Sequence, residues 1–195
     1  RDWSSDVCSS DLNLMWGMSS WTSTRDVWTP RIANLTQANI VTPPSFATPA
    51  EFTNRPMVTS ELNDGAAILS ERVQAVLNEG LRAVDAATVL ANPGNFFINN
   101  YWSNDAVTAN GNRHIAGAFR ILPLTLANNE FRFLDPSRRI VNYCFTGQTS
   151  AAVAFYLRVL GYDVYSFSWG ANSMWNSAMT SNRWPITPNN FPLVQ

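Results

Sequence analysis

Residues 139–150 read RIVNYCFTGQTS, and this stretch decides the predicted fold. The β-branched and aromatic run RIVNY predicts a buried strand that ends at Cys144. Gly147 supplies the backbone freedom that the following turn needs. Ser150 then opens an alanine-rich helix. The thiol therefore lies where a buried strand passes through a short loop into a helix, and it is either a reagent or a small buried side chain.

The same alternation of strands and helices extends along the chain. Apolar residues at helical spacing predict a helix within 61–80, which Gly80 ends. Asp85 is placed to cap a second helix. The other predicted elements are strands at 81–84, 95–103, 138–144 and 163–169, a short strand within 113–122, and helices at 85–92, 124–135 and 150–162, the last with a left-handed stop at Gly161. Strands that alternate with helices predict an α/β fold with a mostly parallel sheet flanked by helices.

The composition is that of a globular chain with a substantial core. Hydrophobic residues make up 46% of the chain and charged residues 14%, and the formal net charge is −1. Every basic residue is arginine, and no basic stripe is interleaved with aromatic residues, so nucleic acid is not an expected partner. No apolar run approaches the roughly 18 residues of a membrane span, and no Cys/His cluster predicts a metal site. The sequence does not determine the location of the protein. Low charge and abundant Asn, Ser, Thr and Trp favour an extracytoplasmic bacterial location.

The first twelve residues, RDWSSDVCSSDL (1–12), resemble the translation of a sequencing adapter. This segment is acidic and serine-rich, whereas a signal peptide has a basic start and an apolar stretch. We expect it to be an artefact and the natural sequence to begin upstream of Asn13. With these residues set aside, Cys144 is the only credible cysteine.

Two tryptophan-rich stretches form a weak internal repeat. WGMSSW at 16–21 is followed by Trp28, and WGANSMW at 169–175 is followed by Trp184. Such a repeat predicts that residues 13–35 are the end of a preceding domain of the same kind. The alternative is a pair of unrelated tryptophan-rich surface helices.

The loop that follows Cys144 is suited to holding a negative charge. Open α/β sheets bind ligands at the carboxyl ends of their strands. Successive backbone N–H groups in such a loop can form an anion nest, and the helix N-terminus beneath it adds about half a positive charge. This geometry favours a thiolate, or an anion attached to the sulfur.

The segment from about Leu81 to Trp175 resembles a rhodanese-like domain, the sulfurtransferase fold. In that family the active-site loop begins with the persulfide-forming cysteine at a strand end and runs for six residues, here CFTGQT at 144–149. RHIAGA at 113–118 resembles the family's other signature, a His-Ile-x-Gly-Ala turn, and LGYDVYSFSWG at 160–170 resembles its closing strand. The motifs occur in the expected order over about half of the chain.

The resemblance implies a sulfurtransferase in which Cys144 takes up sulfane sulfur as a persulfide and passes it to a thiol acceptor, without a cofactor. The donor would be a small sulfur compound such as thiosulfate, polysulfide or a persulfide. The substrate-binding loop would consist of Phe145, Thr146, Gly147, Gln148 and Thr149. The related phosphatase and arsenate-reductase branch uses a loop one residue longer that ends on Arg, so the present loop disfavours phosphate chemistry.

Two departures from the family pattern favour a second hypothesis, a non-catalytic binding or persulfide-carrier module. Many members place Arg directly after the cysteine, whereas this chain has Phe145, so no guanidinium there orients an anionic donor. Asn100 and Trp102 stand where the family's Asp-x-Arg pair is expected, which we interpret as altered packing.

For several residues the sequence allows both a structural and a functional interpretation. Cys144 is either a small buried hydrophobe or a functional thiol, and the loop and the motif order favour the second. His114, the only histidine, is expected to pack and to hydrogen-bond its turn rather than act as a general base. Thr149 either hydrogen-bonds the sulfur or caps the helix. The tryptophans from Trp169 to Trp184 are expected to form core and domain contacts.

The predicted organisation is a rhodanese-like domain at 61–195, with an N-terminal helix and a Trp-rich tail. A Pro- and Thr-rich linker at 36–60 precedes it. Residues 13–35 are expected to be the remnant of an upstream rhodanese-like domain, or else an N-terminal extension. The expected partners are the sulfur donor, the thiol acceptor and this upstream domain, and neither nucleic acid nor a membrane span is expected.

Overall fold

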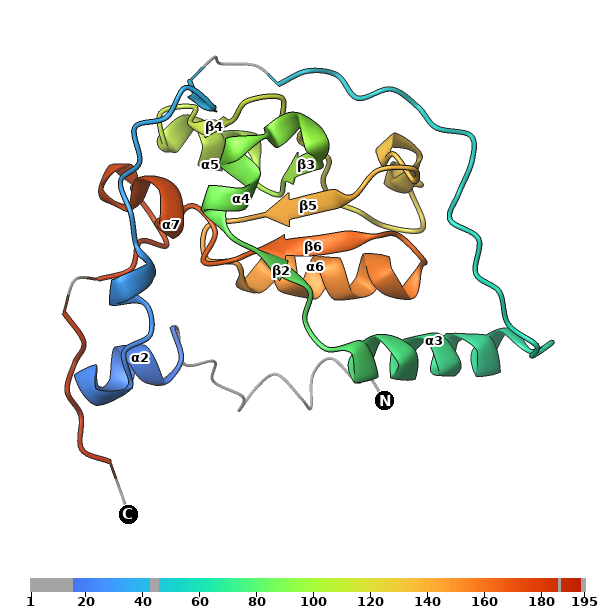
Figure 1. Cartoon of the computed structure of the whole chain (residues 1–195), viewed down its shortest axis with the longest axis horizontal. Coiled ribbons are helices and arrows are strands. Elements are labelled where there is room, and N and C mark those ends of the chain that lie inside the picture. The colour runs from blue at the N-terminus through green and yellow to red at the C-terminus, as the bar shows by residue number, and fades with distance from the viewer. Residues whose placement is uncertain (1–15, 43–45, 186, 194–195) are drawn as a thin grey trace. The chain divides into compact units, whose positions relative to one another are not determined.

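The computed structural model describes residues 16–42, 46–185 and 187–193 (Figure 1). The chain forms two units, which are described separately. The first unit lies within 1–32 and 184–195, and the second spans 33–183. The predicted adapter segment, 1–12, lies outside the described residues.

The second unit is built on a four-stranded sheet in which every neighbouring pair of strands is parallel. The spatial order is β2-β6-β5-β3, so that β5 and β6 are central. The strands are β2 (Ala83–Val84), β3 (Phe97–Asn100), β5 (Ile140–Tyr143) and β6 (Val164–Phe167). The predicted α/β fold with a mostly parallel sheet is confirmed, and each strand lies within a segment predicted as a strand.

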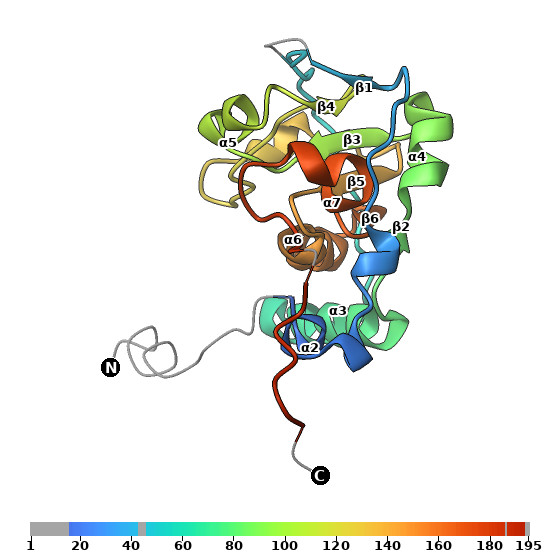
Figure 2. The same cartoon turned by 90° about the vertical axis from the view of Figure 1, so that its left-hand side faces the viewer.

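Both faces of the sheet are buried. Successive side chains of a strand point to opposite sides, and the residues on each side pack in an apolar cluster. Ile140 packs in one apolar cluster with Leu157 of α6, while its neighbour Val141 packs in the other with Val107 of α5. Figures 1 and 2 both show β4 (His114–Ile115) beyond the β3 edge of the sheet, and α3 farther out than α6 on the side away from β4. The helices of this unit are α3 (Gly65–Glu79), α4 (Ala86–Ala91), α5 (Asn104–Ala109), α6 (Gln148–Val159) and α7 (Asn172–Trp175).

Two of the predicted signals at helix ends are confirmed. The Asp85 carboxylate accepts a hydrogen bond from the Thr88 N–H at 2.8 Å and caps α4, as predicted. Gly161 has a positive φ of 96° just after α6. Within the described ranges, every helix falls short of the length and apolarity that a bilayer crossing requires.

Two further predicted elements have different outcomes. The short strand expected within 113–122 is β4 (His114–Ile115), which pairs antiparallel with β1 (Ile40–Val41) in a separate two-stranded sheet. The predicted helix at 124–135 is only the 3-10 turn η4 (Glu130–Phe133). The Glu130 carboxylate accepts hydrogen bonds from the N–H and hydroxyl of Thr125, and these close a turn where a helix was expected.

The segment predicted as a linker, 36–60, contributes β1 and two aromatic anchors to the second unit. Phe46 and Phe52 each pack against one of the two apolar clusters. The Phe52 N–H also donates a 2.6 Å hydrogen bond to the Arg132 carbonyl. The role of segment 36–60 as a linker to an upstream domain stays a prediction. The other 3-10 turns among the described residues are η1 (Ser23–Arg25), η2 (Thr29–Arg31), η3 (Pro93–Asn95) and η5 (Asn176–Ala178).

The first unit contains the short helix α2 (Met18–Trp21) and a cluster of three tryptophan rings. Trp16 lies 4.6 Å from Trp28 and 5.4 Å from Trp184, measured between ring centroids. Trp28 and Trp184 are stacked with an interplanar angle of 17°. The Trp184 indole N–H donates a hydrogen bond to the Thr29 hydroxyl at 3.0 Å. Aromatic rings from both ends of the chain thus form the core of this unit.

The two members of the predicted repeat share an unusual backbone conformation. Trp16 and Gly17 have φ values of 70° and 59°, and Trp169 and Gly170 have φ values of 63° and 55°. A positive φ is uncommon for a tryptophan. A four-residue helix follows each pair, α2 in the first unit and α7 in the second. The two stretches therefore share a local backbone conformation, and the repeat itself stays a prediction.

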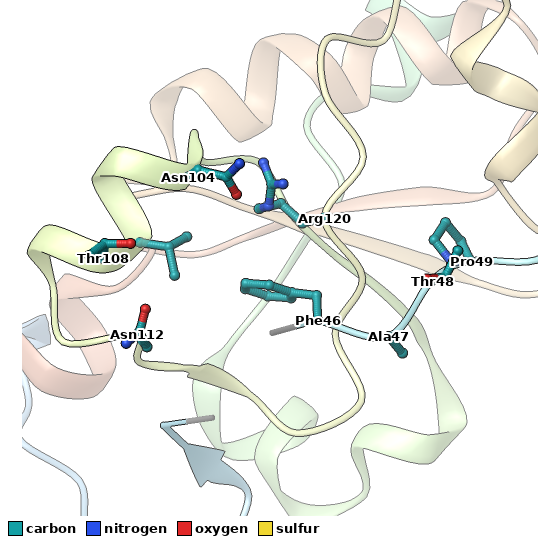
Figure 3. A pocket seen from close by; sticks show the side chains of 9 residues that line it. Phe46, Ala47, Thr48, Pro49, Asn104, Thr108, Asn112 and Arg120 are labelled. Carbon is teal, nitrogen blue, oxygen red and sulfur yellow. The ribbon is translucent and has the colours of Figure 1, made fainter. Parts of the chain in front are cut away.

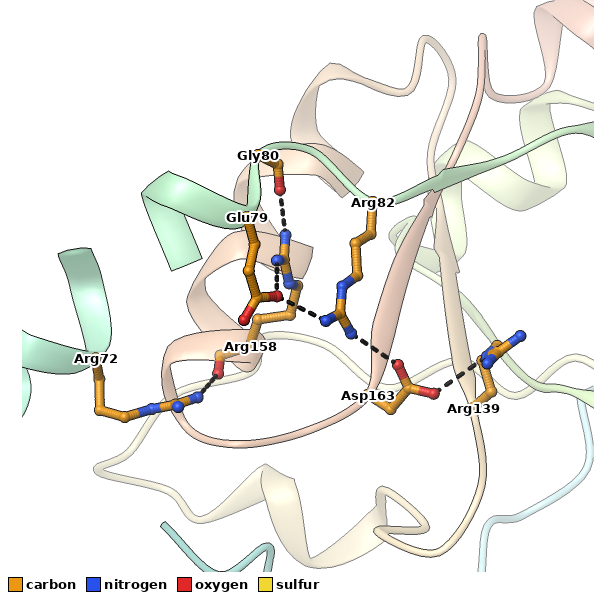
Figure 4. A network of polar contacts seen from close by, with 7 residues as sticks. All are labelled: Arg72, Glu79, Gly80, Arg82, Arg139, Arg158 and Asp163. Atoms are coloured by element: carbon orange, nitrogen blue, oxygen red, sulfur yellow. Dashed lines mark hydrogen bonds and ion pairs between the residues drawn. The ribbon is translucent and has the colours of Figure 1, made fainter. Parts of the chain in front are cut away.

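A network of charged side chains attaches α3 to the sheet and to α6 (Figure 4). The Arg158 guanidinium, whose residue is only 4% exposed, donates hydrogen bonds to the Glu79 carboxylate at 2.7 Å and the Gly80 carbonyl at 2.6 Å. Arg72 of α3 donates in turn to the carbonyls of Arg158 and Val159 at the end of α6. The other ion pairs of the network, Arg82–Glu79, Arg82–Asp163 and Arg139–Asp163, are more exposed.

We expect Arg158→Met to lower the free energy of unfolding by about 1–3 kcal/mol, because it removes hydrogen bonds made by a buried charged group. Arg139→Met is the matched control: the Arg139 side chain is 52% exposed, and its ion pair with Asp163 should contribute less than about 1 kcal/mol. Urea unfolding followed by tryptophan fluorescence measures both. Equal losses for the two variants would contradict this assignment.

Stability should also fall in acid through Glu79. The hydrogen bond from Arg158 holds the pKa of the Glu79 carboxyl below its ordinary value of 4.5. A carboxyl whose pKa is lower in the folded state stabilises the fold above the unfolded pKa, and this contribution is lost as the pH falls through the folded pKa. The stability difference between the wild type and Glu79→Gln should therefore be constant above about pH 4.5 and shrink below it. A pH series of urea unfolding curves tests this, and a difference that grows in acid would contradict it.

Candidate functional site

Cys144 directly follows β5, a central strand, at the carboxyl edge of the parallel sheet. The residue is buried, with 4% of its surface exposed, and its thiol is free of any disulfide. The structure therefore places the cysteine at the strand end that the sequence indicated.

Two backbone N–H groups point at the sulfur. The N–H of Gly147 lies 3.3 Å from the Sγ atom, and that of Ser150 lies 3.4 Å from it. Gly147 has a φ of 88°, which turns the chain around the sulfur. The helix α6 begins at Gln148, so the prediction that Ser150 opens the helix is wrong by two residues. The N-terminal turn of α6 is thus itself part of the loop that surrounds the sulfur.

Side chains beneath the loop keep this conformation in place. The Ser150 hydroxyl donates to the Gly147 carbonyl at 2.9 Å, and it lies 2.9 Å from the Ser166 hydroxyl of β6. The Thr146 hydroxyl accepts a hydrogen bond from the Gln148 N–H at 3.3 Å. Thr149 neither bonds the sulfur nor caps α6 in the described structure; its exposed side chain faces the pocket described below.

The segment after β6 closes over the loop through backbone contacts. The Ala171 N–H donates to the Cys144 carbonyl at 3.0 Å. The Phe145 carbonyl accepts from the Asn172 N–H at 3.3 Å and from the Asn172 side-chain amide at 2.8 Å. Gly170 lies so close that an added Cβ would be 2.3 Å from the Cys144 carbonyl oxygen. The closing glycine of the sequence motif is therefore required by direct contact between two backbone segments.

A pocket of about 290 Å³ opens onto Cys144. Its walls come from the ends of β3 and β5, the start of α5 and the start of α6. None of the lining residues carries a charged side chain. They are Tyr101, Trp102, Ser103, Ala106, Cys144, Phe145, Thr146, Thr149 and Asn182. Of the five predicted loop residues after Cys144, only Phe145, Thr146 and Thr149 line this pocket, while Gly147 and Gln148 do not.

The two aromatic residues at the positions where the family pattern has arginine contact each other directly. The rings of Phe145 and Trp102 are stacked, with centroids 4.1 Å apart and an interplanar angle of 11°. The edges of Tyr143 and Trp175 pack against Trp102 at centroid distances of 6.1 and 6.3 Å. The sequence marked both positions as departures, but nothing in it showed that they form one stack.

Buried amides lie on both faces of the strands beside the cysteine. Asn99 of β3 and Asn142 of β5 are in register, and their side chains share a 2.9 Å hydrogen bond. Asn100 lies near the Tyr143 hydroxyl, but neither polar atom of its amide is hydrogen-bonded within the described structure. Burial raises the pKa of the Tyr143 phenol well above its ordinary value, so the phenol stays neutral. The interpretation of Asn100 as a packing residue agrees with its full burial.

His114 lies outside the Cys144 pocket. Its Nδ1 atom is 2.7 Å from the Asn112 carbonyl, and its ring packs 4.2 Å from that of Phe46. Burial lowers the pKa of this imidazole. Since it does not face the sulfur, the expected packing role describes it better than that of a base.

A second pocket of about 350 Å³ lies between Phe46–Pro49 and α5 (Figure 3). The side chains of Asn104 and Arg120 turn toward one another at its wall. The pocket contains neither Cys144 nor His114. It therefore offers no group of the predicted chemistry, and the candidate site is the pocket at Cys144.

A thiol at the end of a central parallel strand, held by amides at a helix N-terminus, defines an α/β domain with a cysteine loop. Residues 98–177 match the family model of the rhodanese-like domain, so this part of the chain is a rhodanese-like domain. Domains of this kind include sulfurtransferases, non-catalytic members and phosphatase-like members. No curated protein matches the chain.

Solved structures share part of the fold. A rhodanese-related protein from Thermoplasma volcanium is 18% identical, with a TM-score of 0.43, over 50% of this chain and 94% of that chain. A protein from Lactobacillus plantarum is 19% identical, with a TM-score of 0.38, over 53% and 90%. A protein of unknown function from Rhodopseudomonas palustris, described as a possible tyrosine phosphatase, is 20% identical, with a TM-score of 0.39, over 63% and 96%. Likenesses at this level add nothing about function.

We expect Gly170→Ala to displace the cysteine loop and to destabilise the protein by clearly more than Gly117→Ala. Both glycines have a positive φ, so both substitutions carry a backbone cost of about 1–2 kcal/mol. Only at Gly170 would the added Cβ also meet the Cys144 carbonyl, since the space around Gly117 is open. Urea unfolding of both variants tests the contact, and equal losses of stability would contradict it.

Proposed function

We propose that this domain is a sulfurtransferase that carries sulfane sulfur as a persulfide on Cys144. The observation that carries the proposal is the pair of N–H groups, from Gly147 and Ser150, directed at the Sγ atom. Together with the N-terminus of α6, they stabilise negative charge on the sulfur. A thiolate is the nucleophilic form of cysteine.

The reaction would proceed in two half-reactions. First, the Cys144 thiolate attacks the sulfane sulfur of the donor. A bond forms between Sγ and that sulfur, the donor's own bond to it breaks, and the leaving group departs with the electron pair. Second, an acceptor thiolate attacks the outer sulfur of the persulfide. The bond from Sγ to that sulfur then breaks, which restores the Cys144 thiolate and leaves the sulfur on the acceptor.

The loop residues would act mainly through their backbone. Gly147 provides both an N–H group and the turn, while the side chains of Phe145, Thr146 and Thr149 shape the entrance. Gln148 would contribute through its hydrogen bonds to Thr146. No charged side chain lines the pocket, which leaves phosphate without the cation that would orient it. For this reason phosphatase-like hydrolysis is less well supported than sulfur transfer or a non-catalytic binding module.

The second candidate is a non-catalytic binding or persulfide-carrier module. The absence of any charged side chain from the lining of the Cys144 pocket, and the burial of the sulfur, favour it. The pocket of about 290 Å³ and the two N–H groups favour transfer, because they leave room for a donor and stabilise the charged sulfur.

Incubation with polysulfide or a persulfide should add one sulfur atom to Cys144. Because Cys8 is also present in the chain, the experiment uses Cys8→Ser as the parent protein and Cys8→Ser/Cys144→Ser as the matched control. Intact mass spectrometry should show the added sulfur in the parent alone. Repeated turnover to a thiol acceptor supports an enzyme, whereas loading without transfer supports the carrier. Failure of every donor to load Cys144 would overturn both.

We also propose that residues 13–35 are the remnant of an upstream domain of the same kind. The shared Trp-Gly backbone conformation at 16–17 and 169–170, each followed by a four-residue helix, supports this. The genomic sequence upstream of Asn13 should then encode another α/β unit whose closing strand ends at Trp16. An unrelated upstream sequence would contradict the proposal.

A further inference from the structure

We propose that the Cys144 pocket takes its sulfur from organic persulfides whose leaving group is apolar or aromatic, and that it discriminates against inorganic oxyanions such as thiosulfate. This inference rests on the proposed sulfur transfer and specifies its donor. Three features of the pocket carry it: the charge of its lining, the fixed aromatic wall beside the sulfur, and its size.

The lining offers no electrostatic partner for a charged donor. All nine lining residues are uncharged, and three of them are aromatic: Tyr101, Trp102 and Phe145. The Gly147 and Ser150 N–H groups already bond the Cys144 sulfur, so they are committed to the nucleophile. An oxyanion that entered would lose hydration without a compensating cation, and it would be repelled by the thiolate. An uncharged donor meets neither penalty.

The aromatic wall beside the sulfur is held in one position. Phe145 stacks on Trp102, and Trp102 in turn makes T-shaped ring contacts with Tyr143 and Trp175. The Phe145 carbonyl is fixed as well, because two N–H donors of Asn172 bond it. The half-buried ring of Phe145 is therefore a rigid apolar surface next to the nucleophile. Flat apolar groups pack well against such a surface.

The size of the pocket limits the leaving group. Its volume of about 290 Å³ is at the lower end of small-molecule sites. A single ring with a short linker fits this space better than a peptide does. The exposed Ser103, Thr149 and Asn182 form a neutral polar rim, so the apolar part of a donor would lie toward Phe145.

The transfer step balances without any other reagent. The Cys144 thiolate attacks the outer sulfur of R–S–SH, the protonated form of the donor. A bond forms between Sγ and that sulfur, while the S–S bond of the donor breaks. The leaving group R–S⁻ takes the electron pair, and the proton stays on the transferred sulfur. The products are Cys144–S–SH and R–S⁻, with one negative charge on each side and no net oxidation.

The test compares three donors on the Cys8→Ser protein: benzyl hydropersulfide, cysteine hydropersulfide and thiosulfate. The rate of sulfur loading on Cys144, followed by intact mass, is divided for each donor by its rate with N-acetylcysteine, which removes differences in intrinsic reactivity. We expect the normalised rate with the benzyl donor to exceed that with the other two by about tenfold or more.

Variants of the lining separate charge from aromatic packing. Phe145→Arg should raise loading from thiosulfate and remove the benzyl preference, whereas Phe145→Leu should weaken that preference and still reject thiosulfate. Because Phe145 is stacked in the structure, Thr149→Arg provides a second variant on an exposed lining position. It should raise thiosulfate loading without disturbing the stack.

The outcomes separate the donor assignment from the sulfur transfer on which it rests. Equal normalised rates for the three donors, or fast thiosulfate loading by the Cys8→Ser protein, would overturn the donor assignment and leave the persulfide on Cys144 intact. If no donor loads Cys144, sulfur transfer itself fails, and the donor assignment fails with it. A benzyl preference that Phe145→Leu and Phe145→Arg leave unchanged would also overturn the assignment, because the wall would then not select the donor.

Discussion

The contact between the backbone at Gly170 and the carbonyl of Cys144 is the constraint on which the site depends. The two segments come closer than any Cβ would permit. This approach lets the N–H groups of Ala171 and Asn172 bond the carbonyls of Cys144 and Phe145. With both carbonyls bonded to the closing segment, the N–H groups of Gly147 and Ser150, farther along the same loop, lie 3.3 and 3.4 Å from the sulfur. The sulfur environment is thus set by hydrogen bonds between backbones more than by side chains.

The side chains around this backbone frame form the wall of the pocket that opens onto the sulfur. Phe145 and Trp102 are forty-three positions apart in the sequence, yet the parallel register of β3 and β5 brings their rings to 4.1 Å. A stack of neutral rings occupies the space beside Cys144 and presents an apolar wall to the pocket. The backbone hydrogen bonds that shape the loop do not involve these rings, so the side chains at the entrance can change while the loop keeps its conformation.

Much of the fold was predictable because its signals are local. The buried strand before Cys144, the cap at Asp85 and the stop at Gly161 depend on residues within one or two turns of each other. The start of α6 was misplaced because the loop is shaped by Ser166, which is distant in sequence. The false helix at 124–135 reflects a side-chain contact between Glu130 and Thr125 that apolar periodicity does not register. At the candidate site, the position of the cysteine and the replacement of Arg by Phe145 and Trp102 were visible in the sequence, whereas the stacking of the two rings required the strand register.

The helix α6 connects the two ends of the second unit electrostatically. Its N-terminal turn provides the Ser150 N–H to the Cys144 sulfur, and its last turn offers the carbonyls of Arg158 and Val159 to the guanidinium of Arg72. The start of a helix carries a partial positive charge and its end a partial negative charge. The Cys144 sulfur thus lies at the positive end of α6, and the guanidinium of Arg72 lies at the negative end. Because α3 precedes the matched residues 98–177, a part of the chain that the family model does not cover completes the helix that carries the cysteine loop.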